Sequence, residues 1–405
     1  MNEEKSYNTG ADFEMVATTL FGLEEVLMTE LLRLGAKDIK KLKRAVSFVG
    51  DKGFMYKANY WLRTALRILK PIATFTVSDD KNLYDRMKTV DWKQYLNETD
   101  FLAVSASLST DIFNHTQYIS QKTKDAIVDQ FRENTGKRPS VDLDNPTVRF
   151  HVHVDGNVCT VSLDSSGQPL YKRGYRNEIN LAPLNEALAA GMILLTGWEY
   201  PKAIIDPMCG SGTLPIEAAM IAGNIPPGVY RKEYGFQKWK DYDKVLFDKI
   251  VESSLKKIND VKPLIIGSDI SNNVVRKARQ NVLEAKVDDV VRITCMAFEE
   301  FDPPQGKSGV VIFNPPYGER MDKDDLQQLY KSIGDTLKKK YAGYTAWVIT
   351  SNLEAAKSIG LHHTRRITLY NGGLECKFLR YEMYDGTKKI HKLNKNKKDE
   401  TKTHS

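Results

Sequence analysis

The first 165 residues alternate between short apolar strands and amphipathic helices. Residues 14–36 predict a strand, a turn at Gly22 and a helix, because leucine and valine recur every three or four positions from Leu23 to Leu34. Residues 148–167 predict a β-hairpin with Asp155-Gly156 as its turn. The other predicted elements are a strand, a turn at Gly53 and a helix within 45–65, a strand at 69–77, a helix at 84–96, a strand at 101–110 and a helix at 119–136 that ends at Gly136.

The pattern changes after residue 176, where short aliphatic strands alternate with helices. Residues 181–198 predict a helix, and apolar strands then end within the segments 202–213, 262–271, 288–298 and 309–318. Strands of this kind are typical of a parallel sheet that is covered by helices on both faces. We therefore expect an α/β domain with a Rossmann-like, mostly parallel sheet over residues 166–385, and we place the domain boundary between Asp164 and Tyr171. Residues 223–263 form an insertion between the first helix and the second strand of this domain.

Composition limits the class of protein. The chain has 405 residues, 41% hydrophobic and 27% charged, and its four cysteines are scattered, which excludes a disulfide scaffold and fits a reducing compartment. No apolar run is long enough for a membrane span, and the polar N-terminus is unlike a signal peptide. We expect a soluble, cytoplasmic protein that does not contact a membrane.

The net charge of +7 is concentrated at the C-terminus. Residues 388–405 hold seven lysines and two acids, a balance of +5 that leaves about +2 for the rest of the chain. Residues 386–405 have almost no apolar side chains and are expected to be a disordered basic tail. Such a tail can bind nucleic acid through counterion release, or can serve only to keep the chain soluble.

Three motifs lie at successive strand ends of the predicted sheet. The first is a strand ending at Asp206, followed by a glycine-rich turn, Cys209-Gly210-Ser211-Gly212-Thr213, and a helix to Ala222. Glycines let a ligand approach the backbone beside a helix N-terminus. The turn lacks the spacing and the lysine of a phosphate-binding P-loop, and it differs from the G-x-G-x-x-G turn of dehydrogenases. The second motif ends at Asp269-Ile270, where the acid can accept hydrogen bonds from ribose hydroxyls or cap the helix predicted at 271–285.

The third motif is the most specific. A strand ends in Asn314-Pro315-Pro316-Tyr317, where prolines offer carbonyl oxygens without competing N–H donors. This array suits a planar exocyclic amine: the Asn314 oxygen and a backbone carbonyl of Pro315 or Pro316 each accept one N–H, and the Tyr317 ring stacks on the base. A proline-rich β-turn without catalytic function is the alternative interpretation.

Together these motifs resemble those of class I S-adenosylmethionine-dependent methyltransferases of the amino-methylating group. The longer blocks at 170–198 and 206–228 are similar to THUMP-domain RNA methyltransferases, including the bacterial 23S rRNA guanine-N2 enzymes. The resemblance implies a ferredoxin-like module at 1–60 and a THUMP RNA-binding domain at 61–165, preceding the methyltransferase domain. It also accounts for the insertion at 223–263.

The resemblance implies the following site. S-adenosylmethionine is the expected cofactor, with no metal, and RNA is the expected substrate, rRNA rather than tRNA. The motif Asn314-Pro315-Pro316-Tyr317 would hold the target amine. The expected cofactor-binding residues are Asp206, Cys209, Gly210, Ser211, Gly212 and Thr213 at the methionine half, and Asp269 and Ile270 at the ribose and adenine. Many relatives place an acid after the third strand to bind the adenine amine, but this chain has Ala297 and Phe298 there, so that contact is left unassigned.

Other functions stay open. The same chemistry suits a tRNA guanine N2, an adenine N6 in RNA or DNA, or a protein glutamine, and a non-catalytic RNA-binding assembly factor could keep this fold. His151 and His153 alternate on one strand and could suggest a metal pair, although structural strand histidines are the favoured interpretation. Lys172, Arg173 and Arg176 are candidates for phosphate contacts or for a solvated linker, and Glu217 for a cofactor contact or an exposed helix position.

Overall fold

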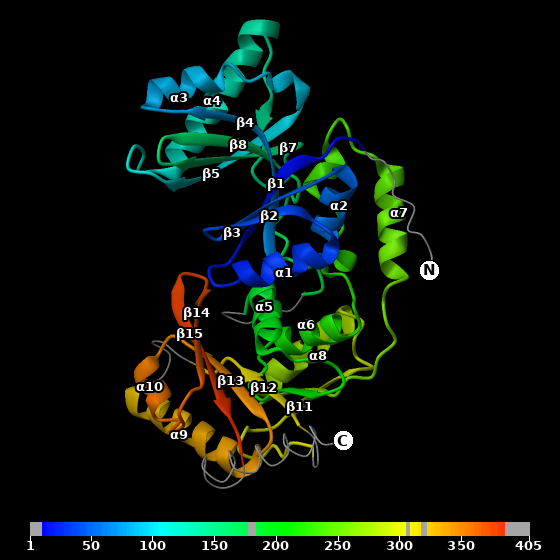
Figure 1. Cartoon of the computed structure of the whole chain (residues 1–405), viewed down its shortest axis with the longest axis vertical. Helices are drawn as coiled ribbons and strands as arrows, with labels where there is room; N and C mark the ends of the chain where they lie inside the picture. The colour runs from blue at the N-terminus through cyan, green and yellow to red at the C-terminus, as the bar shows by residue number, and fades with distance from the viewer. Residues whose placement is uncertain (1–9, 177–183, 305–307, 317–321, 385–405) are drawn as a thin grey trace, which may run out of the picture. The chain divides into compact units, whose positions relative to one another are not determined.

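The computed structural model describes residues 10–176, 184–304, 308–316 and 322–384, which form two compact units. Within these ranges the first unit contains residues up to 19, 27–173 and 226–256. The second contains residues 20–26, the described part of 174–225 and the described residues from 257 onward. Figure 1 shows the helices and strands of both.

The first unit is built on one eight-stranded sheet with the order β2-β3-β1-β4-β8-β7-β5-β6. Its strands are β1 (Phe13–Thr19), β2 (Lys37–Leu42), β3 (Ala45–Gly50), β4 (Ala65–Thr76), β5 (Phe101–Ser109), β6 (Ser140–Val141), β7 (Val148–Asp155) and β8 (Val158–Asp164). The predicted hairpin is confirmed as β7 and β8, with Gly156 at φ 56° in its turn.

The long strand β4 joins the two halves of this sheet. Residues 65–69 pair with β1, and residues 69–76 pair with β8, both antiparallel. The register shifts between Pro71 and Ala73, as expected of a proline, which cannot donate to a ladder. The predicted boundary between the ferredoxin-like module and the THUMP domain, after residue 60, therefore falls just before a strand that pairs with both parts of the sheet.

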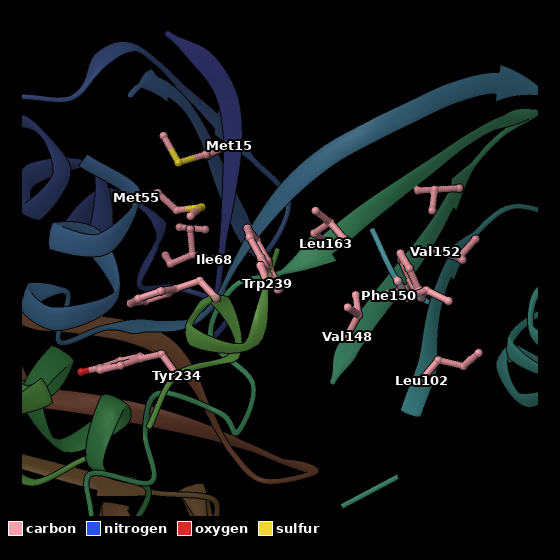
Figure 2. Packing of buried hydrophobic residues seen from close by; sticks show 14 of the residues in the cluster. Met15, Met55, Ile68, Leu102, Val148, Phe150, Val152, Leu163, Tyr234 and Trp239 are labelled. Carbon is pink, nitrogen blue, oxygen red and sulfur yellow. The ribbon is translucent and has the colours of Figure 1, made fainter. Parts of the chain in front are cut away.

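Helices cover the sheet of the first unit. They are α1 (Glu24–Leu34), α2 (Lys52–Trp61), α3 (Asp80–Met87), α4 (Thr116–Thr135) and α7 (Lys244–Leu255), with short 3-10 turns at Trp92–Gln94, Pro227–Tyr230 and Gly235–Lys238. In the cluster of Figure 2, alternate residues Val148, Phe150 and Val152 of β7 are buried. The predicted stop at Gly136 is confirmed, because this residue ends α4 in the left-handed conformation at φ 74°.

Two predicted elements are wrong in detail. Gly53 lies inside α2 and makes no turn, because the Asp51 side chain accepts a hydrogen bond from the Phe54 N–H at 2.7 Å and starts the helix earlier. The helix predicted over 84–96 ends at Met87, where the indole N–H of buried Trp92 donates to the Met87 carbonyl at 2.9 Å. A side chain from outside the helix thus satisfies a carbonyl that a longer helix would have used.

The insertion packs into the first unit. Its Phe236 ring stacks on Tyr56 of α2 with centroids 4.3 Å apart, and Tyr234 and Phe247 join the same buried cluster. Arg231 donates hydrogen bonds to the carbonyls of Ser166, Gln168, Pro169 and Lys172 at 2.9–3.2 Å. The segment around the predicted domain boundary, 164–171, is therefore held by an arginine that follows it by about sixty positions.

The second unit has the predicted α/β architecture. Its seven-stranded sheet has the order β11-β10-β9-β12-β13-β15-β14, in which the first five strands are parallel and β15 is antiparallel to both neighbours. These strands are β9 (Ala203–Asp206), β10 (Ile265–Asp269), β11 (Val291–Cys295), β12 (Gly309–Phe313), β13 (Thr345–Thr350), β14 (Arg365–Asn371) and β15 (Leu374–Glu382). The Rossmann-like sheet is confirmed.

Helices precede or follow most strands of this unit. They are α5 (Glu186–Thr196), α6 (Thr213–Ala222), α8 (Asn272–Glu284), α9 (Lys323–Lys340) and α10 (Leu353–Lys357). The strand order runs outward in opposite directions from β9 and β12, so the sheet has its topological switch point between these two strands. In open α/β sheets of this kind, ligands bind beyond the carboxyl ends of the strands at the switch point.

Candidate active site

The sheet brings the three motifs to one edge. Gly267 of β10 pairs with Asp206, and Val311 of β12 pairs with Ile205, the residue before Asp206. The strands β10 and β12 therefore flank β9, and all three end toward the same side. Asp206, Asp269 and Asn314 stand at or directly after these carboxyl ends.

The glycine-rich turn after β9 is held by backbone and side-chain contacts. The Cys209 N–H donates to the Ser268 carbonyl at 2.8 Å, and the Asn281 amide of α8 donates to the Ser211 carbonyl at 3.1 Å. Gly210 and Gly212 have φ of 53° and 82°, a conformation that side chains disfavour. A Cβ placed on Gly210 would meet no atom of the described residues within 4 Å, so the turn faces open space there.

Two acids flank this open space. One Asp269 carboxylate oxygen accepts the Gly210 N–H at 3.2 Å, and the other accepts the Ser271 N–H at 2.9 Å. Ser271, rather than Asp269, is the N-cap residue of α8. Asp269 thus links the glycine turn to the start of the helix, a role that neither sequence interpretation included.

Asp206 is nearly inaccessible and accepts the Met208 N–H at 3.2 Å. Burial raises the pKa of Asp206 well above its usual range, and the Asp269 charge acts in the same direction. Burial likewise raises the pKa of the neighbouring Cys209 thiol, which stays protonated at neutral pH. A protonated thiol is a poor nucleophile, which agrees with the expectation that no covalent intermediate forms on this cysteine.

Ile270 follows Asp269 and is 77% exposed. An aliphatic side chain this exposed beside a glycine turn offers an apolar wall to a flat ligand. Phe298, by contrast, is buried in the core cluster of the unit, and the Ala297 carbonyl accepts the N–H groups of Glu300 and Phe301 at 3.1 and 3.2 Å. The Phe298 side chain therefore packs in the core of the unit.

Asn314 follows the buried strand β12. Its side-chain oxygen is buried and accepts no hydrogen bond from the residues that the structure describes. Buried polar atoms are almost always paired, because leaving one unpaired costs about 1–3 kcal/mol. Among the described residues, this oxygen at the end of β12 is therefore a candidate acceptor for a donor from outside them. Tyr317 lies outside the described residues.

Sequence reasoning missed Tyr330 on α9. Its hydroxyl forms a 2.7 Å hydrogen bond with the Thr350 hydroxyl and lies 3.5 Å from the Pro316 carbonyl, as a donor to it. Tyr330 falls in the buried stripe of the helix with Leu326 and Ile333, so its position in the sequence resembles that of an ordinary core residue. Only the tertiary contact links it to the motif that begins at Asn314.

Several other predicted residues have structural partners. Arg173 is 1% exposed and donates to the carbonyls of Leu170 and Arg63, so it is neither solvated nor available to phosphate. Arg176 donates to the Thr213 hydroxyl at 2.7 Å and lies 3.4 Å from the Glu186 carboxylate. Glu217 is fully buried and accepts a hydrogen bond from the Tyr175 hydroxyl at 3.1 Å, so it is not an exposed helix acid.

The two strand histidines contact serines. The His151 ring nitrogens lie 3.0 Å from the hydroxyls of Ser105 and Ser107, and His153 lies 2.8 Å from Ser107. Burial lowers the pKa of His151 to about 4, with His153 and Arg67 acting in the same direction. Among the described residues, no group of three or more His, Cys, Asp or Glu side chains is placed to hold a metal ion. None of the described helices is both long and apolar enough to span a membrane.

Comparison with known families matches most of the chain. Residues 173–380 match the RMKL-like methyltransferase domain, residues 77–164 the THUMP domain and residues 14–69 the RlmL ferredoxin-like domain. These three matches follow one another in the order that the sequence resemblance implies.

Individual relatives agree with these matches. The chain is 38% identical to the ribosomal RNA large subunit methyltransferase K/L of Syntrophotalea carbinolica over 92% of its own length and 54% of the relative. It is 35% identical to slr0064 of Synechocystis sp., which carries the name of an RNA methyltransferase, over 91% of its own length and 96% of the relative. The chain thus spans about half the length of the K/L relatives it matches.

A solved structure extends the comparison to the fold. The protein SMU.472, solved in complex with SAH, is 29% identical, with a TM-score of 0.82 over 93% of this chain and all of the other. The strand order, the glycine turn beside two acids and the family matches all lead to one conclusion. The chain belongs to the family of THUMP-domain, RMKL-like methyltransferases, whose class I fold uses S-adenosylmethionine as its cofactor.

Proposed function

We propose that this chain methylates an exocyclic amine of an RNA base, namely guanine N2 in 23S rRNA. The observation that carries the proposal is the buried Asn314 oxygen, which accepts no hydrogen bond within the described ranges of the chain. A planar amine placed at this oxygen would satisfy it. The rRNA substrate is supported by the names of the K/L relatives, and an RNA substrate in general by the THUMP match.

The residues at the sheet edge fit S-adenosylmethionine. A Cβ on Gly210 would meet no described atom within 4 Å, which supports a ligand lying against the backbone of the glycine turn. In our proposal Cys209, Ser211, Gly212 and Thr213 line the same pocket. In our proposal the buried Asp206 carboxylate lies at the methionine end, where it would pair with the ammonium group. Asp269 would hold the ribose and Ile270 would pack on the adenine. When bound, the cofactor supplies a methyl group on a positively charged sulfur.

The residues of the third motif hold and orient the amine. The Asn314 oxygen accepts one N–H, and a proline carbonyl accepts the other. Tyr330 already donates toward the Pro316 carbonyl, which favours Pro315 as the second acceptor. Tyr317 would stack on the base, which must leave its helical stack to reach the site. When these two acceptors hold the amine, the nitrogen lone pair is localised and points toward the methyl group. Holding the nitrogen in this position supplies most of the rate enhancement. The amine proton is lost to water or to these acceptors.

The test is nucleoside mass spectrometry of rRNA and tRNA from a strain that lacks the gene. The proposal predicts that N2-methylguanosine is missing from the 23S rRNA fraction, and that the wild-type gene restores it while Asn314→Ala does not. Asn273→Ala, which changes an exposed asparagine of α8 in the same unit, is the control and should restore it. Loss of N2-methylguanosine from tRNA alone, or of N6-methyladenosine instead, would assign another substrate, and unchanged nucleosides would contradict the proposal.

A further inference from the structure

The hairpin β14–β15 extends beyond the sheet edge that carries the candidate site. Thr350, the last residue of β13, pairs with Lys377 of β15, and Lys377 pairs with Thr368 of β14. The residues between Thr368 and Lys377 therefore lie past the carboxyl end of β13. Tyr370 and its partner Glu375 are two positions farther out, or about 7 Å at the rise of a strand.

Asn314 stands at the same edge. It follows Phe313, which pairs with Val348 of β13. The strands β12, β13, β15 and β14 are consecutive in the sheet, so Tyr370 is displaced from Asn314 by three strand spacings, or about 14 Å, across the sheet. The register also places Tyr370 three residues, or about 10 Å, farther along the strand direction, which makes the total about 17 Å. The hairpin thus flanks the candidate site within the same unit.

A second segment of this unit packs on the hairpin. The Phe21 ring meets the Tyr370 ring edge to face, with centroids 5.6 Å apart and an angle of 84°. Gly22, at φ 88°, lies so close to β14 that a Cβ there would be 2.4 Å from the Thr368 carbonyl oxygen. This contact requires glycine and fixes the loop against the strand. The Tyr370 hydroxyl donates to Glu375 at 3.0 Å, which orients the second ring.

Both rings remain partly exposed to solvent. Phe21 is 40% exposed and Tyr370 is partly exposed. Single exposed apolar side chains are common on proteins, but aromatic rings held in a fixed edge-to-face pair at the surface are suited to binding. Every nucleobase has a face that stacks on an aromatic ring, whatever its sequence.

We propose that Phe21 and Tyr370 form a stacking surface for an unpaired RNA base near the target nucleotide. The proposal rests on the proposed function, because extruding a base for methylation leaves its neighbours without a stacking partner. The aromatic pair, about 17 Å from Asn314 at the same edge of the sheet, offers a stacking partner to another unpaired base of the same RNA. It therefore contributes to RNA affinity without touching the cofactor or the reacting amine.

The test compares substitutions that separate stacking from packing. Phe21→Leu keeps an apolar contact with Tyr370 but loses the ring face, whereas Phe21→Tyr keeps both. With a 23S rRNA transcript as substrate, Phe21→Leu should raise KM at least about 5-fold and leave kcat, cofactor affinity and melting temperature unchanged. Phe21→Tyr should resemble the wild type, as should Leu283→Ala, which trims a 53% exposed side chain of α8.

Direct binding keeps this inference separate from the proposed function. A short single-stranded RNA that carries 2-aminopurine should lose fluorescence on stacking with the wild type, and much less with Phe21→Leu. Quenching without any RNA methylation would overturn the proposed function and support the stacking surface. Methylation with the same KM for Phe21→Leu and the wild type would overturn the stacking surface alone. A joint loss of melting temperature and cofactor affinity would show that Phe21 only packs the loop, which also overturns it.

Discussion

Replacing Asn314 by alanine should separate catalysis from stability. The asparagine oxygen is buried and accepts no hydrogen bond from any described residue, so Asn314→Ala removes no hydrogen bond among these residues. Leaving a buried acceptor unpaired costs about 1–3 kcal/mol. Because the residue as a whole is partly exposed, the cavity left by alanine is small. The free energy of unfolding should therefore stay unchanged or rise by up to about this amount, where most substitutions at a strand end would lower it.

The effect on the reaction has the opposite sign. Losing one of two acceptors leaves the amine poorly oriented, and we expect kcat to fall about 10²-fold, or about 2.7 kcal/mol, with cofactor affinity unchanged. The assay combines denaturant melts, calorimetry with S-adenosylmethionine and methyl transfer to RNA. Asn314→Leu, which fills a similar volume, should show the same loss of rate. A stable Asn314→Ala protein with wild-type rates, or one that unfolds more easily and loses the cofactor, would refute this account of the motif.

Three further predictions concern the surrounding residues. Gly210→Ala should weaken cofactor binding, measured by calorimetry. The control Gly136→Ala, which is also at positive φ with open space around it, should lower the melting temperature but leave cofactor affinity unchanged. Equal cofactor affinities of Gly210→Ala and the wild type would contradict this. Because burial raises the pKa of Asp206 above 3.8, the unfolded state ionises first as pH rises, so Asp206→Asn should raise the melting temperature of the free protein at pH 7 and progressively less toward pH 4. Because the pKa of His151 is lowered from 6.5 to about 4, the wild-type free energy of unfolding should fall as pH drops through this range. In His151→Gln, the free energy of unfolding obtained from denaturant melts should depend less on pH.

The local elements could be predicted where the signal is local. The hairpin at 148–164 combines alternating apolar residues with Asp155-Gly156, and the helix ending at Gly136 needs only its own stop residue. The helix predicted through residue 96 was wrong because Trp92 reaches back to the Met87 carbonyl, a contact that periodicity does not contain. The packing of Phe236 on Tyr56 joins residues 180 positions apart, and no pattern along the chain indicates it.

In the candidate site, too, the local features could be predicted and the long-range contacts could not. The strand ends that carry Asp206, Asp269 and Asn314 were predicted from residue type and order, and the parallel sheet sets them along one edge. The link from Asp269 to the Gly210 N–H and the approach of Tyr330 to the Pro316 carbonyl were not predicted, because each depends on how loops and helices pack on the sheet. Tyr317 remains a prediction from sequence.

Methyl transfer by the purified full chain tests the central claim most directly. The wild type and Asn314→Ala would each be incubated with labelled S-adenosylmethionine and either an unmodified 23S rRNA transcript or unmodified tRNA transcripts, and the product nucleosides separated by mass spectrometry. We predict labelled N2-methylguanosine in the 23S rRNA with the wild type, about 10²-fold less with Asn314→Ala, and none in the tRNA. Label in N6-methyladenosine, label in tRNA instead of 23S rRNA, or equal incorporation by both proteins would contradict the account.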